Sequence, residues 1–320
     1  MTQFERLTTK GKFQNKGDTK KSIRVVGLRE FLSLEFPPRE NIIAPWLPTQ
    51  GLALIYGLRG IGKTLFAMWV AMVTACTGEF LKWKAEKSYG VLYLDGEMPA
   101  VVDQERLSTL VISIDKEPIA PLKLVTPDLQ EWGMPDLSTI EGQQLIESHL
   151  EGVSLVIVDN ISTLCRQGRE NEAESWLPVQ EWGLRLRSQH KSVLFVHHSG
   201  KGGLQRGTSR REDVLDTIIA LKRPQDYMPN EGARFEVHFE KARNLHGDDV
   251  KPFEAKLTTV DGKQVWLMKD VEDSLTYRVA ELLNEGVAQH DIPDILGVSK
   301  GTVSKHKYKA KSLGLLRGQK

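Results

Sequence analysis

Short runs of apolar residues, bounded by glycine or by polar residues, recur along the first two thirds of the chain. Five of them have the length and composition of buried strands, at residues 51–56, 90–94, 154–158, 192–196 and 217–221. Between these runs, apolar positions at helical spacing predict helices over residues 64–77, 101–110 and 176–188. Strands that are apolar throughout and alternate with helices are typical of a parallel sheet with helices on both faces, so the pattern predicts an α/β fold.

The pattern changes after Pro224, where alternation of apolar and polar residues replaces the continuous apolar runs. Residues 235–239 alternate in this way. Residues 253–260 and 263–268 flank an Asp261-Gly262 pair, which favours an antiparallel hairpin that closes the sheet.

The two ends of the chain differ in character from this central region. Residues 1–35 form a basic segment that is predicted to be disordered, with a short amphipathic helix at 28–34. The main α/β domain is predicted to cover residues 36–268, and the acidic stretch 269–274 is predicted to be a linker. Residues 275–320 are predicted to form a small, separate, all-α domain.

The distribution of charge also distinguishes the two ends of the chain from its middle. The net charge is only +1, yet residues 1–24 carry seven Lys/Arg against two acids, and residues 299–320 carry seven and no acid. Basic ends on an acidic body suit a polyanionic partner such as nucleic acid. Two cysteines, Cys76 and Cys165, indicate a reducing compartment, and no apolar run is long enough for a membrane span. We therefore expect a cytoplasmic protein with no membrane partner.

The loop after the first predicted strand carries the pattern G-x-x-x-x-G-K-T, from Gly57 to Thr64. Gly57 and Gly62 let the backbone wrap closely around phosphates, whose charge then faces the loop amides and the N-terminus of the next helix. Lys63 is expected to reach the β- and γ-phosphates of ATP, and the hydroxyl of Thr64 is expected to hold Mg²⁺. The predicted nucleotide-binding residues are Gly57, Gly60, Gly62, Lys63, Thr64 and Leu65.

Hydrolysis also requires a carboxylate beside the metal and another that activates water. Asp159 follows the strand at 154–158, which is the expected position of the second Mg²⁺ contact. Two acids follow the strand at 90–94, and either Glu97 or Asp95 could polarise the attacking water.

These and further motifs resemble the RecA-type hexameric ATPases, the plasmid RepA helicase group most closely and the DnaB-type replicative helicases more distantly. The resemblance covers roughly residues 36–268. It rests on Pro37-Pro-Arg-Glu, Trp46-Leu-Pro, the phosphate loop, Leu94-Asp-Gly-Glu-Met-Pro with Arg106, Ile157-Val-Asp-Asn, Val196-His-His-Ser-Gly-Lys-Gly-Gly, Arg206-Gly-Thr-Ser and Lys241-Ala-Arg-Asn. It implies a RecA-like P-loop core, and it favours Glu97 over Asp95 as the water activator.

The resemblance also implies roles for residues around the nucleotide. A polar residue at the end of the fourth strand senses the γ-phosphate, and of His197 and His198 we prefer His197. Lys241 and Arg243 would reach into the nucleotide site of a neighbouring subunit, where a guanidinium stabilises charge on the transferred phosphoryl group. Arg206 is a second candidate for this arginine finger. A site completed across an interface implies a homo-oligomer, which in this family is a hexameric ring.

The stretch 199–213, directly after the fourth strand, is rich in glycine and basic residues. In rings of this family such a loop faces the central channel and contacts single-stranded DNA. Its cationic side chains would neutralise phosphates, and they are Lys201, Arg206, Arg210 and Arg211. An ordinary surface loop is the alternative.

In the C-terminal region, apolar residues have the spacing of two helices that cross at a tight turn containing Gly297. This resembles the helix-turn-helix of response regulators and resolvases. Ser299 is expected to cap the second helix, and Pro293 is tolerable only in the first turn of the first helix. The residues expected to face duplex DNA are Lys300, Thr302, Ser304, Lys305 and Lys307. A protein-docking module is the alternative.

The sequence as a whole predicts an ATP-dependent DNA motor of the RepA helicase type, from a plasmid, phage or integrated element, tethered to DNA by its C-terminal domain. The alternatives are an ATP-gated DNA-binding regulator and a defence or recombination ATPase with the same core.

Overall fold

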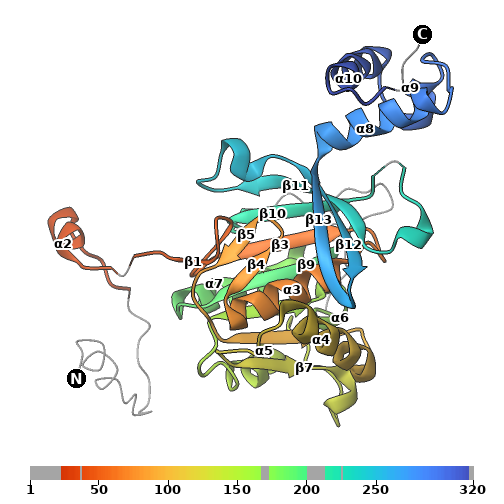
Figure 1. Cartoon of the computed structure of the whole chain (residues 1–320). Helices are drawn as coiled ribbons and strands as arrows, with labels where there is room; N and C mark the ends of the chain where they lie inside the picture. The colour runs from red at the N-terminus through yellow and green to blue at the C-terminus, as the bar shows by residue number, and fades with distance from the viewer. Residues whose placement is uncertain (1–22, 37, 167–172, 200–212, 225, 317–320) are drawn as a thin grey trace, which may run out of the picture. The chain divides into compact units, whose positions relative to one another are not determined.

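The computed structural model describes residues 23–36, 38–166, 173–199, 213–224 and 226–316 (Figure 1). The chain divides into two units, residues 1–38 and 39–320. In the first unit, helix α2 (Leu28–Ser33) forms where the sequence predicts a short helix, and none of its residues is buried. The prediction of disorder falls mainly on residues 1–22, which lie outside the described residues.

Within the described residues, one sheet has nine strands in the order β13-β12-β11-β10-β3-β9-β8-β6-β7. Its parallel part consists of β3 (Leu52–Gly57), β6 (Val91–Asp95), β7 (Leu122–Val125), β8 (Leu155–Asp159), β9 (Ser192–His198) and β10 (Thr217–Lys222). The antiparallel strands β11 (Arg234–Ala242), β12 (Phe253–Val260) and β13 (Lys263–Asp270) extend it beyond β10. The prediction of a mostly parallel α/β fold with a RecA-like core is confirmed.

Helices cover both faces of the parallel strands (Figure 1). Helices α3 (Lys63–Cys76) and α4 (Ala100–Ile114) pack on one face, and α5 (Ile140–Glu147), α6 (Ile161–Leu164) and α7 (Ala173–Ser188) pack on the other. Successive residues of each strand therefore both meet apolar side chains, which explains why the strands read as unbroken apolar runs. None of the described helices combines the length and apolar character needed to cross a bilayer.

The five expected parallel strands are confirmed, but the hydrophobic pattern misses several elements. Edge strand β7 and helix α5 are two of them. Helix α6 is a third, and two short hairpins are also missed, formed by β1 (Asn41–Ile43) with β2 (Leu47–Pro48) and by β4 (Gly78–Phe80) with β5 (Trp83–Ala85). Strands of two or three residues are too short to show a period, so the sequence carries no signal for them.

The antiparallel hairpin after the parallel strands is confirmed, because β12 and β13 pair from Phe253↔Asp270 to Val260↔Lys263. The prediction of a linker at 269–274 is wrong. β13 runs to Asp270, and helix α8 (Val271–Asn284) begins at the next residue. Acidic residues are favoured in the first turn of a helix, so an acidic stretch does not by itself distinguish a linker from a helix start.

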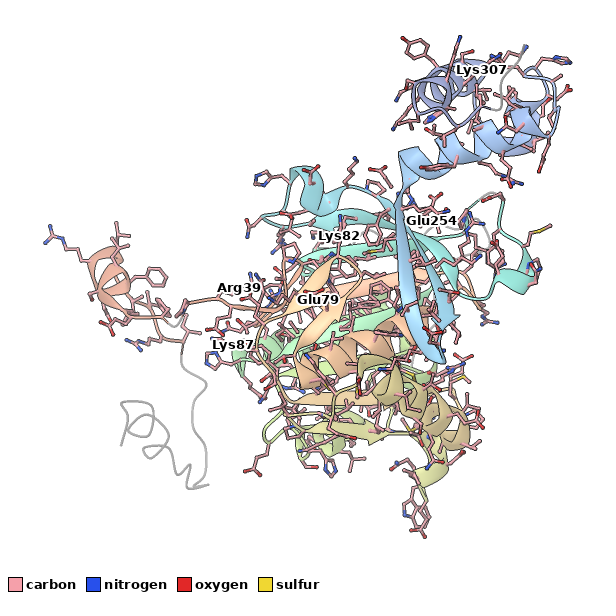
Figure 2. All side chains as sticks on the ribbon, in the orientation of Figure 1. Arg39, Glu79, Lys82, Lys87, Glu254 and Lys307 are labelled. Atoms are coloured by element: carbon pink, nitrogen blue, oxygen red, sulfur yellow. The ribbon has the colours of Figure 1, made fainter. Side chains whose placement is uncertain are left out.

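Helices α8, α9 (Ile292–Leu296) and α10 (Lys300–Ser312) share an apolar cluster of their own. α9 ends at Gly297, which has a left-handed φ of 59°, and the hydroxyl of Ser299 caps α10 by accepting a hydrogen bond from the amide of Thr302 at 3.1 Å. Pro293 lies in the first turn of α9. Figure 2 shows the side chains on these helices and labels Lys307 on α10. The turn, the cap and the proline lie where the sequence predicts them.

Candidate active site

The phosphate loop joins the end of β3 to the start of α3, so both expected neighbours are in place. At Gly57 an added Cβ would lie 2.6 Å from the carbonyl oxygen of Leu221 on the adjacent strand. Gly60 and Gly62 have φ values of +71° and +110°, a region that favours glycine. The loop therefore depends on its glycines to bring backbone amides to the N-terminus of α3, where an anion is favoured.

Lys63 is buried at the start of α3. Its Nζ donates hydrogen bonds to the carbonyl oxygens of Gly57, at 3.0 Å, and of Leu58, at 2.8 Å. Burial lowers the pKa of Lys63 to about 8, although the nearby charges of Asp159 and Glu97 oppose this change. A polyphosphate beside the ammonium would favour its charged form, so the site is built to gain from a bound anion.

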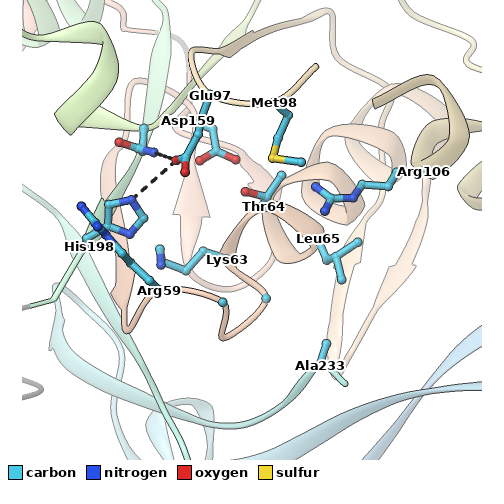
Figure 3. Close-up of a pocket in the computed structure, with 13 residues that line it drawn as sticks. Arg59, Lys63, Thr64, Leu65, Glu97, Met98, Arg106, Asp159, His198 and Ala233 are labelled. Carbon is cyan, nitrogen blue, oxygen red and sulfur yellow. Dashed lines mark hydrogen bonds and ion pairs between the residues drawn. The ribbon is translucent and has the colours of Figure 1, made fainter. Parts of the chain in front are cut away.

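A cavity of about 330 Å³ lies over the phosphate loop (Figure 3). The loop and the ends of β6, β8 and β9 contribute to its lining. It brings together most of the residues predicted from the sequence, namely Gly60, Gly62, Lys63, Thr64, Leu65, Glu97 and Asp159. Gly57 does not line the cavity, and its predicted role is limited to the bend at the end of β3.

Glu97 lies in the segment after β6 and lines the cavity (Figure 3). Its Oε2 accepts a hydrogen bond from Nδ2 of Asn160 at 2.7 Å and lies 3.6 Å from Nε2 of His198. Its side chain is 54% exposed, so water can reach the carboxylate. A carboxylate that is held at one oxygen and open to water is suited to act as a general base.

Asp95, the other candidate base, is the last residue of β6 and is buried. Its Oδ1 accepts hydrogen bonds from the amides of Glu97 and Met98, both at 2.8 Å. Asp95 does not line the cavity. Its carboxylate shapes the turn that presents Glu97, and this geometry favours Glu97 as the residue that meets water.

Asp159 ends β8 and pairs in register with Asp95 on β6. Its Oδ2 accepts a hydrogen bond from the hydroxyl of Tyr93 at 2.7 Å. Burial, followed by the charge of Asp95, raises the pKa of Asp159 to about 6, while hydrogen bonds from Tyr93 and Thr64 act in the opposite direction.

The oxygens at this position fit the predicted Mg²⁺. The Thr64 hydroxyl and the Asp159 carboxylate are the hard oxygen donors that Mg²⁺ prefers. Oδ2 of Asp95, in the same buried group, has no hydrogen-bond partner among the described residues. Thr64 and Asp159 would hold the ion, which would neutralise charge on the phosphate oxygens of the substrate.

Comparison with known proteins places this geometry in a family. Residues 22–203, more than half of the chain, match the family described as the AAA domain. The chain belongs to this family. The matched region contains the phosphate loop, Glu97, Asp159 and both histidines of β9, and the protein is a P-loop ATPase.

Among curated proteins, none matches the chain. Among solved structures, the chain is similar to a KaiC-like protein from the hyperthermophilic archaeon Pyrococcus horikoshii, at 14% sequence identity and a TM-score of 0.49. That match covers 71% of this chain and 93% of the other.

In this AAA domain, the structure places His198 on the cavity and His197 away from it. Residues of β9 alternate between the two faces of the sheet, so His198 follows Val196 on the α3 face and His197 follows Phe195 on the α7 face. Of the two histidines considered as γ-phosphate sensor, it is therefore His198, and not the preferred His197, that lines the cavity. Burial and the charge of Lys63 lower the pKa of His198, while the nearby carboxylate of Glu97 opposes this change.

Lys241 and Arg243 lie at the opposite edge of the sheet from the phosphate loop of their own chain. The carboxyl end of β11 meets the amino ends of β10 and β3, whereas the phosphate loop follows the carboxyl end of β3. Nη2 of Arg243 donates a hydrogen bond to the carbonyl oxygen of Asp213 at 2.8 Å, and Nζ of Lys241 donates to the same oxygen at 3.4 Å. Neither residue lines the cavity over its own phosphate loop.

The residues predicted to contact DNA are only partly described. Those of the basic loop, Lys201, Arg206, Arg210 and Arg211, lie outside the described residues. On α10, Lys300, Ser304 and Lys305 are exposed, and Thr302 and Lys307 are half-buried. Nζ of Lys307 donates a hydrogen bond to Oε1 of Gln289 at 2.8 Å.

The sequence predictions assigned no role to Asn160. Besides its hydrogen bond to Glu97, its Oδ1 accepts one from the amide of Thr163 at 3.3 Å and caps helix α6. Asn160 thus fixes Glu97 relative to the end of β8. Its position directly after Asp159 in a recognised motif was the available signal. Arg59 and Arg106 also line the cavity, and their charges complement a polyanion.

Asp103 on α4 is a buried acid whose protonation makes the stability of the fold depend on pH. It is 3% exposed, its Oδ1 has no hydrogen-bond partner in the described part of the chain, and burial followed by the charge of Asp95 raises its pKa to about 7. Between about pH 4 and pH 7 the folded state thus binds the proton more tightly than the unfolded chain, so the stability contributed by this proton is lost as pH rises through 7.

We expect Asp103→Asn to raise the melting temperature at pH 8 and to change it little at pH 4.5, because the substitution removes a buried charge that forms only at the higher pH. Thermal unfolding followed by circular dichroism measures this. Glu105→Gln, an exposed acid on the same helix, is the control and should show no such difference. Equal shifts at both pH values would contradict the prediction.

Proposed function

We propose that this ATPase is a ring-forming, ATP-dependent DNA motor of the RepA helicase type, which hydrolyses ATP at the interfaces between its copies. The observation that carries the proposal is the separation of Arg243 from the phosphate loop within one chain. A guanidinium that stabilises the charge of phosphoryl transfer must lie beside the transferred group. Arg243 lies at the opposite edge of the sheet, so the site it serves belongs to another copy.

The basic loop 199–213 is proposed to contact single-stranded DNA. Its two described ends, Ser199 and Asp213, make hydrogen bonds to residues of the ATPase domain. The amide of Ser199 donates a hydrogen bond to the carbonyl oxygen of Gly57 at 2.9 Å, and the carbonyl of Asp213 accepts from Lys241 and Arg243. DNA bound to this loop would therefore act on the chain's own phosphate loop and on the residues that serve its neighbour.

The C-terminal helices are proposed to hold duplex DNA. Helix α10 contains five lysines and no acidic residue, and its capped N-terminus follows a tight turn from α9. The side chains of Val303 and Ala310 are buried, so the lysines of the remaining positions provide a basic face. A basic helix after a tight turn is the arrangement with which helix-turn-helix proteins enter the major groove.

ATP-dependent strand displacement on a forked duplex tests the motor directly, with Lys63→Ala as the inactive control. We expect single-stranded DNA to stimulate ATP hydrolysis. Replacing both Arg210 and Arg211 by alanine should weaken this stimulation and reduce its salt dependence by roughly one slope unit per lost phosphate contact. An ATP-gated regulator would instead show no stimulation by single strands, no unwinding, and duplex affinity that changes with ATP.

A second set of variants separates the two DNA surfaces. Lys300→Glu combined with Lys305→Glu should abolish site-specific duplex binding in a mobility-shift assay and leave ATP hydrolysis and its stimulation by single strands unchanged. The matched control replaces two exposed lysines of the sheet domain, Lys84 and Lys269, by glutamate. If both double variants bind duplex equally well, α10 is not the duplex-binding element.

A further inference from the structure

Asp216, just before β10, gathers three arginines around one buried carboxylate. Its Oδ2 accepts hydrogen bonds from Nη2 of Arg39 at 3.2 Å and from Nη2 of Arg187, and its Oδ1 lies 3.8 Å from Nη1 of Arg243. The amide of Leu52 donates to the same Oδ2 at 3.0 Å. One carboxylate compensates one guanidinium, so this group carries an excess of two positive charges.

Arg39 belongs to the Pro37-Pro-Arg-Glu motif, and it does not line the cavity over the phosphate loop. Its Nε and Nη2 donate to the carbonyl oxygens of Thr49 and Gln50, so the side chain is held in place. Its Nη1 has no hydrogen-bond partner among the described residues, and the side chain is 43% exposed, close to the 48% of Arg243. Figure 2 labels Arg39 among the side chains of this region. Hydrogen bonds from Nε and Nη2 thus hold the side chain of Arg39 in place, while its Nη1 can still donate to a ligand.

A concave space of about 330 Å³ adjoins Arg39, Asp216 and Arg243. Polar side chains of Asn41, Thr217 and Asn244 also line it. Planar guanidinium groups bind phosphoryl oxygens in a bidentate manner, and neutral amides and hydroxyls complete such a site. Burial lowers the pKa of Arg187, the charge of Asp216 opposes this change, and the charges of Arg39 and Arg243 add to it. A bound anion would favour the charged form of these guanidinium groups.

We propose that Arg39 and Arg243, positioned by Asp216, form one anion-binding site that takes the terminal phosphates of ATP bound to a second copy of this chain. The inference rests on the proposed function, which assigns Arg243 to the neighbouring nucleotide. It adds Arg39 as a second residue that acts between copies and Asp216 as the residue that positions both. The phosphates of DNA are the other source of the same ligand chemistry, and ATP hydrolysis in the absence of DNA separates the two.

Mixing of subunits tests this assignment, because it distinguishes residues that act on the neighbour from residues that act in their own subunit. Without DNA, Arg39→Gln should bind a fluorescent ATP analogue normally and hydrolyse ATP about 10- to 100-fold more slowly. Mixed with Lys63→Ala it should regain activity, because some interfaces then pair an intact phosphate loop with an intact arginine pair. Mixed with Arg243→Ala it should regain none, because every interface then lacks one of the two arginines.

Several outcomes would overturn the proposal. Recovery in the mixture with Arg243→Ala would place Arg39 in its own subunit's site, and loss of ATP binding by Arg39→Gln alone would make it a residue of the fold. Loss of DNA stimulation with unchanged basal hydrolysis would assign the site to DNA.

Arg39→Lys, which keeps the charge, should retain more activity than Arg39→Gln. Arg185→Gln, which removes a half-buried arginine paired with Glu147, is the matched control and should hydrolyse ATP normally. Failure of Arg243→Ala and Lys63→Ala to complement each other would instead contradict the proposed function.

Discussion

Replacement of Glu97 by glutamine is expected to leave ATP binding intact and to slow hydrolysis by about 10²- to 10⁴-fold, the usual contribution of a positioned general base. Glutamine can still accept the hydrogen bond from Nδ2 of Asn160, so the segment after β6 keeps its shape. What is lost is the carboxylate that is proposed to take a proton from water. Phosphate release under saturating ATP, together with equilibrium binding of a fluorescent ATP analogue, measures the two effects separately.

Two comparison variants make this result interpretable. Lys63→Ala should lose binding and turnover together, because the ammonium contacts the phosphates directly. Asp95→Asn keeps an oxygen that can accept from the amides of Glu97 and Met98, so its turnover should fall less than that of Glu97→Gln. Near-normal turnover in Glu97→Gln, with Asp95→Asn inactive, would transfer the role of base to Asp95.

Replacement of Arg243 by alanine should reduce hydrolysis by about 10³-fold or more and leave ATP affinity unchanged, because arginine fingers act on the charge that develops during phosphoryl transfer. Under the proposed function the missing group serves the neighbouring copy's site, so an equimolar mixture with Lys63→Ala should be more active than either variant alone. Turnover in the mixture, measured across a range of mixing ratios, reports the fraction of interfaces that are complete.

The same experiment has a clear opposite result. If wild-type protein keeps its full turnover at a dilution where sedimentation shows only monomers, the site is complete within one chain and Arg243 has no role between copies. Lys222→Ala is a useful control, because this lysine lies opposite Glu236, towards the other end of β11, and has no assigned part in hydrolysis.

The parallel core could be predicted because its strands are buried on both faces and therefore unbroken in their hydrophobicity. Strand β7 escaped prediction for the opposite reason. It lies at the edge of the sheet, and none of its four residues is fully buried. The start of α8 escaped because an acidic helix N-terminus and an acidic linker have the same composition. Within the parallel part of the sheet, strands are thus predictable where burial is complete, and the edge strand that solvent reaches is missed.

Within the site, the phosphate-binding residues could be predicted because they are contiguous and their spacing reflects one local loop. The choice between His197 and His198 depends on which face of β9 each residue occupies, and the burial pattern of β9 alone does not reveal it, because both faces are apolar. Asn160 was missed because its contact with Glu97 joins residues that are far apart in sequence. The cluster around Asp216 brings together residues from four distant segments of the chain, and no short sequence pattern predicts such a cluster.

The register between β6 and β8 fixes the relative positions of two acidic residues beside the phosphate loop. Asp95 and Asp159 are paired across the two strands, and the amide of Gly96 donates to the carbonyl oxygen of Asp159 at 2.7 Å. The main chain at Asp159, which would hold the metal, and the main chain at Asp95, where the turn that bears Glu97 begins, are therefore separated by the spacing of adjacent strands, about 4.8 Å. This spacing is common to all sheets and does not respond to changes in loop sequence. The register therefore fixes the separation of Asp95 and Asp159, whereas the position of Glu97 also depends on the segment after β6 and on the hydrogen bond from Asn160.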